Sequence, residues 1–385
     1  MTDQTTMPPM TESSMDKPVL SRLASLDVLR GLTIALMILV NTSGDGKHTY
    51  ALLEHAAWNG LTIADVVFPC FLFMVGISVA ISLTGRLKRG VTHGAILLQA
   101  ARRSAVLFVL GLAVNSFPFF DLHTLRIFGV LQRIAICSFI ATVLFLRARP
   151  RTIFVLTAGI LVGYWALLRW TPVPGVGVAF MDTHNNLPAW VDRHLLPVNH
   201  LYSAGYYDPE GLLSTFPSIA TSLLGLLAGM WIVRHGRSYL TAKRLGAAGA
   251  TCLLAGLLWS LWFPLNKRLW TSSFVLLNAG LDMLMLGLLL WQIDLRGKAK
   301  RLLYPALVFG TNPLAAYIFS EFLAAGLSSF HVPGSRLNLQ QWIYQPLAAH
   351  ISNPYMASLV YAVLFVGVCF VPVAVLYRRK IYLRL

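Results

Sequence analysis

The residues best suited to chemistry lie in the polar stretch between Asn41 and Pro69, which separates two long apolar runs. His55 lies within it, and a histidine side chain, with an unperturbed pKa of about 6.5, can take a proton from an amine or hydroxyl at neutral pH. Asp65 can orient that imidazole, as a carboxylate does in a catalytic triad. Asn41 supplies an amide donor for a developing oxyanion. We predict that His55, Asn41 and Asp65 are catalytic.

Each of these residues also has an ordinary structural interpretation. His55 can be an interfacial histidine bonded to a carbonyl. Asp65 can stabilise a helix N-terminus through the helix dipole, and Asn41 can end a helix. An Asn-Gly turn precedes Thr62, which we expect to cap the helix that Asp65 opens. Spacing alone does not show that the three side chains converge.

Five further residues are predicted to contact a sugar substrate. Trp58 can stack on a sugar ring next to Asn59, although an interfacial aromatic belt is the alternative for such tryptophans. Asp208 and Glu210, in the segment YYDPEG, can bond hydroxyls or an ammonium group, or can cap the helix that follows. Glu321, in a late apolar run, is a charge that helix capping or kinking does not explain.

A cation within an apolar run indicates a site for an anion. Arg133, which follows Gln132, is costly at membrane depth and can hold a phosphate or carboxylate. Pairing with Asp282, also within an apolar run, is the alternative. Asn312 precedes a proline that is expected to kink its helix. We predict that Gln132, Arg133 and Asn312 contact the co-substrate, and we assign no role to Asp282.

Several reaction classes are disfavoured. The sequence has no Walker loop, GxGxxG, GxSxG or HExxH motif, which argues against hydrolysis and ATP-driven transport. His184, His194 and His200 lack the tight spacing of metal ligands, so we predict no metal. Topology and anionic headgroups account for the formal charge of +16, and no nucleic-acid partner is expected.

These residues must be positioned by membrane-spanning helices. Hydrophobic residues make up 56% of the chain and charged residues 12%, with a mean hydropathy of +0.66. Apolar runs of about 17 to 22 residues recur, enough to cross roughly 30 Å of hydrocarbon. We predict an all-α, polytopic integral membrane helix bundle of about ten transmembrane helices. The predicted spans are 26–42, 63–84, 100–117, 127–146, 152–170, 212–233, 245–263, 272–292, 303–323 and 356–377.

The basic residues predict the orientation of these spans. Most of the 31 Lys and Arg residues fall in alternate connections and at both ends of the chain, which places both termini in the cytoplasm. The opposite connections then form periplasmic loops 43–62, 171–211 and 324–355. Residues 1–22 are predicted to be a disordered polar cytoplasmic tail, and residues 23–385 a single transmembrane acyltransferase domain.

Five segments resemble the heparan-α-glucosaminide N-acetyltransferase family of membrane acetyltransferases: RLASLDVLRGLTIALMILVN, HAAWNGLTIADVVFPCFLFMVGIS, GVLQRIA, YYDPEGLLST and YRRKIYLRL. The resemblance extends over nearly the whole chain, and HAxWNGLTxADxVFPxFxFxxG is its most specific motif. It implies that acetyl-CoA donates an acetyl group to the amine of a terminal glucosamine across the membrane. It also implies that His55 is catalytic and that Asn41 takes part.

The short N-terminal tail suggests a bacterial inner-membrane relative without a large preceding luminal domain. We therefore predict acetyl transfer to a glucosamine-type amino sugar or glycan on the periplasmic side, with His55 as general base and membrane lipids as surroundings. Direct transfer and an acetyl-histidine intermediate both remain open, as does a homodimer. A sugar or ion-coupled secondary transporter and a non-catalytic scaffold protein are the alternative functions.

Overall fold

The computed structural model describes residues 23–202, 205, 207–297 and 303–383, and the predicted tail 1–22 lies outside them. The described residues form helices and two isolated β-bridges, with no longer strand among them. The prediction of an all-α membrane helix bundle is therefore confirmed.

Thirteen α-helices follow one another in the described residues. They are α1 (Ala24–Asn41), α2 (Ile63–Lys88), α3 (His93–Ser116), α4 (Val130–Arg147), α5 (Pro150–Trp170), α6 (Leu187–Leu195), α7 (Leu212–His235), α8 (Tyr239–Trp259), α9 (Ser272–Leu289), α10 (Tyr304–Thr311), α11 (Pro313–Ser329), α12 (Leu339–His350) and α13 (Pro354–Arg378). A 3₁₀ turn, η1 (Val198–His200), follows α6, and a π-helical segment, η3 (Leu290–Leu295), continues α9.

Each of the ten predicted spans corresponds to a helix or a broken helix. Eight helices among the described residues are long and apolar enough to cross a membrane. The predicted break before Pro313 divides the ninth span into α10 and α11, which are bent by 87° relative to each other. The remaining predicted span, 245–263, corresponds to α8, which has 21 residues but carries Lys243 and Arg244 and is less apolar than the eight.

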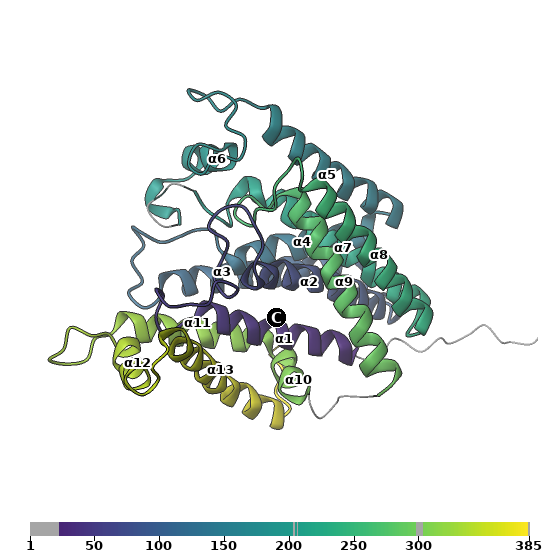
Figure 1. Ribbon diagram of the computed structural model, residues 1–385. Coiled ribbons are helices and arrows are strands. Elements are labelled where there is room, and N and C mark those ends of the chain that lie inside the picture. The colour runs from purple at the N-terminus through teal and green to yellow at the C-terminus, as the bar shows by residue number, and fades with distance from the viewer. Residues whose placement is uncertain (1–22, 203–204, 206, 298–302, 384–385) are drawn as a thin grey trace, which may run out of the picture.

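Helices α2, α7 and α9 form the centre of the bundle. The most apolar stretch of α7 is 72% buried, whereas that of α3 is 17% buried. Figure 1 shows α5 and α8 along one side of the molecule and α10 to α13 on the opposite side, with α1 and α2 between them. Glycines allow α2 and α7 to pack closely. A Cβ at Gly76 of α2 would lie 1.9 Å from the Ser222 carbonyl oxygen of α7, and a Cβ at Gly225 of α7 would lie 1.9 Å from the Phe73 carbonyl oxygen of α2.

The starts of α2, α4, α7 and α9 lie at one end of the bundle, where α1 ends. Hydrogen bonds join these starts in pairs. Asn266, in the connection before α9, donates to Asn59, in the segment before α2, and Arg133 of α4 donates to the Gly211 carbonyl just before α7. We call this the His55 end. The segment between α5 and α7 contains α6, and the segment between α11 and α13 contains α12, so both long predicted loops are partly helical.

Candidate active site

Asp65 is held in the first turn of α2 by the residues that precede the helix. Thr62 donates to its Oδ2 from the backbone N–H at 3.2 Å and from the hydroxyl at 3.0 Å. The backbone N–H of Ala56 donates to the same oxygen at 3.1 Å. Thr62 and Asp65 form a capping box, so the predicted cap is confirmed. These bonds fix the carboxylate and leave Oδ1 for another donor.

His55 lies against that remaining oxygen. Its Nδ1 is 2.8 Å from Asp65 Oδ1, and the His55 side chain is 46% exposed whereas that of Asp65 is 1% exposed. A fixed carboxylate that accepts the Nδ1–H bond favours the imidazole tautomer with an unprotonated Nε2. This arrangement can supply a base at His55 Nε2. The structure thus brings together two of the three residues predicted to be catalytic.

Lys267 lies beside the same imidazole and is a site residue that the sequence did not predict. Its Nζ is 3.1 Å from His55 Nδ1, 3.3 Å from His55 Nε2 and 3.7 Å from Asp65 Oδ1. Burial lowers the pKa of the Lys267 ammonium, although Asp65 and Glu210 attract its charge. Lys267 is 212 positions from His55 in the chain, so no local motif could have indicated the contact.

Trp58 and Asn59 tie the segment before α2 to neighbouring loops. The Trp58 indole N–H donates to the Met181 carbonyl at 2.9 Å. The side-chain oxygen of Asn59 accepts from the buried amide of Asn266 at 3.1 Å. The Trp58 ring also meets the ring of Tyr207 edge to face, with centroids 6.1 Å apart. Both predicted sugar contacts therefore lie in this segment, with polar groups that already bond protein atoms.

Asp208 and Glu210 form an ion-pair cluster with Arg126, whose role the sequence did not reveal. Arg126 Nε donates to Asp208 Oδ2 at 3.0 Å, and Arg126 Nη2 donates to both carboxylates. Burial opposes the charge of Glu210, but Arg126 beside it holds the pKa of Glu210 below its ordinary value. The two carboxylates that were predicted to bind a sugar thus accept hydrogen bonds from the guanidinium of Arg126.

Arg133 is fully buried near the start of α7. Its Nη2 donates to the Gly211 carbonyl at 3.2 Å and to the Ser214 hydroxyl at 2.5 Å. The guanidinium lies 5.0 Å from the centroid of the Trp270 ring. Its Nε and Nη1 have no hydrogen-bond partner among the described residues. No ion pair joins Arg133 to Asp282 in that part of the chain, so the pairing considered as an alternative is not observed.

The two other predicted co-substrate contacts lie elsewhere. Gln132 is fully buried and faces α3, where a Cβ at Gly111 would lie 2.4 Å from the side-chain oxygen of Gln132. Asn312, between α10 and α11, donates to the Ile381 carbonyl at 3.0 Å and accepts from the Leu383 N–H at 2.9 Å. The Asn312 amide therefore holds the C-terminal segment, and the three residues do not form one cluster.

Asn41, at the end of α1, lies next to Glu321 on α11. The structure thus pairs a predicted catalytic residue with a predicted substrate contact. The hydrogen bonds and ion pairs of the described chain do not connect these two side chains to His55.

Asp192, on α6, is a second buried carboxylate that sequence reasoning missed. Its Oδ1 accepts the backbone N–H of Leu212 at 2.9 Å and so holds the first residue of α7. Its Oδ2 is buried with no hydrogen-bond partner in the described residues. Burial raises the pKa of Asp192 to about 6. The only available signal in the sequence was an acidic residue in a long polar connection.

Asp192→Asn should remove a pH dependence of stability. The pKa of Asp192 in the folded protein, about 6, lies above its ordinary value of 3.8, so protonation favours the folded state. This contribution is complete below about pH 4 and is lost as the pH rises through about 6, with a full size of ~3 kcal/mol. As the pH is lowered from above 6 to about 4, the Tm of the wild type should therefore rise relative to that of the variant. A constant Tm difference would contradict the prediction.

The fold and the site together define a polytopic helical membrane protein with a histidine–carboxylate pair at one end of its bundle. The family model described as heparan-alpha-glucosaminide N-acetyltransferase, catalytic, matches residues 22–265. The chain belongs to this family, which confirms the resemblance of its motifs.

Two curated relatives, both named heparan-alpha-glucosaminide N-acetyltransferase, are similar to most of the chain. The protein from Mus musculus is 30% identical over 365 residues, which cover 79% of this chain and 54% of the relative. The protein from Homo sapiens is 30% identical over 362 residues, which cover 78% and 53%. The chain therefore spans about half the length of the relatives that it matches.

Proposed function

We propose that this protein is a membrane acetyltransferase that moves an acetyl group from acetyl-CoA to the amine of a glucosamine-type amino sugar or glycan. The names of the two relatives support the reaction class. We further propose that transfer occurs on the periplasmic side of a bacterial inner membrane, because the basic residues favour that orientation for the His55 end. The single observation that carries the proposal is the 2.8 Å contact between exposed His55 and buried Asp65.

In the proposed reaction, the amine nitrogen attacks the thioester carbonyl carbon, its proton passes to His55 Nε2, and the carbon–sulfur bond breaks. The products are an amide and CoA, whose sulfur receives the proton from the imidazolium. Asp65 keeps Nε2 unprotonated in the resting state and stabilises the imidazolium that forms. Asn41 is proposed to stabilise the tetrahedral oxyanion. A ternary complex suffices, because a neutral amine reacts with a thioester without covalent help.

The contacts of the predicted binding residues support different proposed roles for them. Arg133 has two donor nitrogens without partners in the described residues, which supports a contact with an anionic group of CoA. The carboxylates of Asp208 and Glu210 already accept hydrogen bonds from Arg126. This favours a structural role for them, in fixing the segment that precedes α7, over a direct contact with the sugar. Trp58 and Asn59, adjacent to His55 in the same segment, remain the proposed sugar contacts.

The proposal is tested with purified full-length protein, acetyl-CoA carrying a radiolabelled acetyl group, and a panel of amino sugars. Label transfer to the sugar amine is expected. Labelled protein formed before the acceptor is added, together with ping-pong kinetics, would instead indicate an acetyl-histidine intermediate. Sugar uptake by proteoliposomes without acetyl-CoA, and no acetylated product with it, would overturn the proposal in favour of a transporter.

Asp65→Asn should lower kcat by about 10²-fold, less than the removal of the imidazole itself. The amide keeps the size of the side chain but can present an N–H group to His55 Nδ1, which favours the tautomer with the proton on Nε2. Initial rates at saturating substrate measure the effect. An unchanged kcat would show that Asp65 serves only as a helix cap.

A further inference from the structure

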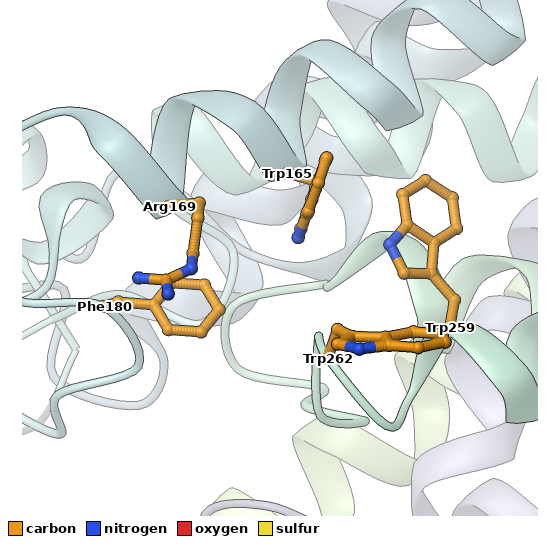
Figure 2. A pocket seen from close by; sticks show the side chains of 5 residues that line it. All are labelled: Trp165, Arg169, Phe180, Trp259 and Trp262. Carbon is orange, nitrogen blue, oxygen red and sulfur yellow. The ribbon is translucent and has the colours of Figure 1, made fainter.

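An aromatic pocket lies at the His55 end, between the ends of α5 and α8. It has a volume of about 490 Å³, is open to the surface, and is lined by Trp165, Arg169, Phe180, Trp259 and Trp262. Figure 2 shows the indole nitrogen of Trp165 directed into the space between the Arg169–Phe180 pair and the two tryptophans of the α8 end. Four aromatic side chains and one cation thus surround a volume in the range typical of small-molecule sites.

The lining has the chemistry of a carbohydrate site. Aromatic faces offer apolar contact area for the C–H face of a pyranose ring, and an indole N–H or a guanidinium can donate to its hydroxyls. The Trp165 indole nitrogen is buried without a hydrogen-bond partner in the described residues, which is costly for a donor. Arg169 is exposed and lies 5.1 Å from the centroid of the Phe180 ring, which holds its guanidinium at the pocket.

Two separate segments connect this pocket to the candidate active site. Phe180 lines the pocket, and the next residue, Met181, accepts the indole N–H of Trp58. Trp262 lines the pocket, and Lys267 in the same connection contacts His55. Five residues of chain span at most about 18 Å. The pocket is therefore within the reach of a short oligosaccharide whose terminal amine lies at His55.

We propose that this aromatic pocket binds a sugar ring of the acceptor other than the one that reacts, so that the pocket residues determine how strongly an oligosaccharide is preferred over glucosamine. This inference rests on the proposed function for the identity of the reacting end. The pocket itself is a sugar site whether or not acetyl transfer occurs. A lipid headgroup held by Arg169, with the tryptophans as part of an interfacial aromatic belt, is the competing occupant; the unpartnered indole nitrogen of Trp165 favours a ligand with hydroxyl groups.

The test compares glucosamine with a β-1,4-linked glucosamine trisaccharide as acceptors. In Trp262→Ala, the ratio of kcat/KM for the trisaccharide to kcat/KM for glucosamine should fall by about tenfold, which corresponds to ~1.4 kcal/mol. Trp262→Phe should restore most of that ratio, because it keeps an aromatic face. Trp342→Ala, which removes an exposed tryptophan on α12 that does not line the pocket, is the matched control and should not alter it.

A binding measurement separates this inference from the proposed function. Tryptophan fluorescence of the full-length protein is titrated with the trisaccharide in the absence of acetyl-CoA. Saturable quenching that Trp262→Ala weakens supports the sugar site even if no acetyl transfer is found. An unchanged substrate ratio and unchanged quenching in Trp262→Ala would overturn it. So would quenching by phosphatidylglycerol nanodiscs, but not by the trisaccharide, which would assign the pocket to lipid.

Discussion

His55→Ala is expected to lower kcat for acetyl transfer to glucosamine by about 10³-fold, within the range that a positioned general base contributes. The change removes the imidazole whose Nδ1 lies 2.8 Å from Asp65. An amino sugar is largely protonated at neutral pH, so the enzyme must both hold its neutral form and accept the proton that attack releases. Initial rates with purified protein and saturating acetyl-CoA measure the loss.

A second histidine–carboxylate pair in the same loop provides the control. His48 Nδ1 lies 2.6 Å from Asp45 Oδ2, but the Asp45 side chain is 31% exposed, whereas that of Asp65 is 1% exposed. His48→Ala should therefore leave kcat close to the wild-type value. His55→Gln, which can still donate to Asp65 but cannot take a proton, should lose as much activity as the alanine variant. Equal rates in all these proteins would rule out His55 as the base.

Local sequence was sufficient for part of this site. Thr62 and Asp65 are three residues apart, the spacing of a capping box, so the helix start and the carboxylate position followed from the sequence. His55 lies only ten positions from Asp65, and a turn between them was predicted. A short loop closed onto a helix start leaves few arrangements for such a pair.

The remaining contacts are long-range and carried no local signal. The sequence indicated no role for Lys267 or Arg126, because their partners lie 212 positions away in His55 and 82 positions away in Asp208. Which buried charges meet depends on how helices pack, and apolar runs resemble one another too closely to specify this. The co-substrate prediction illustrates the limit, because the Asn312 amide binds the C-terminal segment.

Hydropathy predicted the membrane spans because a bilayer imposes a length and an apolar composition on each helix. Two of the predicted spans depart from this rule for other reasons. Pro313 follows Asn312 and breaks the ninth span, but the sequence could not supply the 87° bend. Helix α8 is less apolar than the other predicted spans and packs against α9 with glycines on both helices, Gly249 and Gly280. The helix with the lower hydropathy, α8, is thus packed closely against its neighbour α9.

The largest expected effect on stability comes from Arg126→Met. The methionine keeps much of the apolar length of the side chain but leaves Asp208 and Glu210, which are 3% and 8% exposed, without their counterion. Removing one partner of such a buried ion pair costs about 3–5 kcal/mol, because the remaining charges are poorly solvated. A clearly lower Tm in detergent is expected.

Two further variants distinguish this cause from a general loss of positive charge. Arg336→Met removes an exposed arginine between α11 and α12 and should change Tm little. Combining Arg126→Met with Asp208→Asn and Glu210→Gln removes all three charges and should recover part of the lost Tm, because uncharged groups are less costly to bury than unpaired carboxylates. If the triple variant were no more stable than Arg126→Met alone, the stacking of Arg126 on Tyr202, at 4.6 Å, would account for the loss instead of its charge.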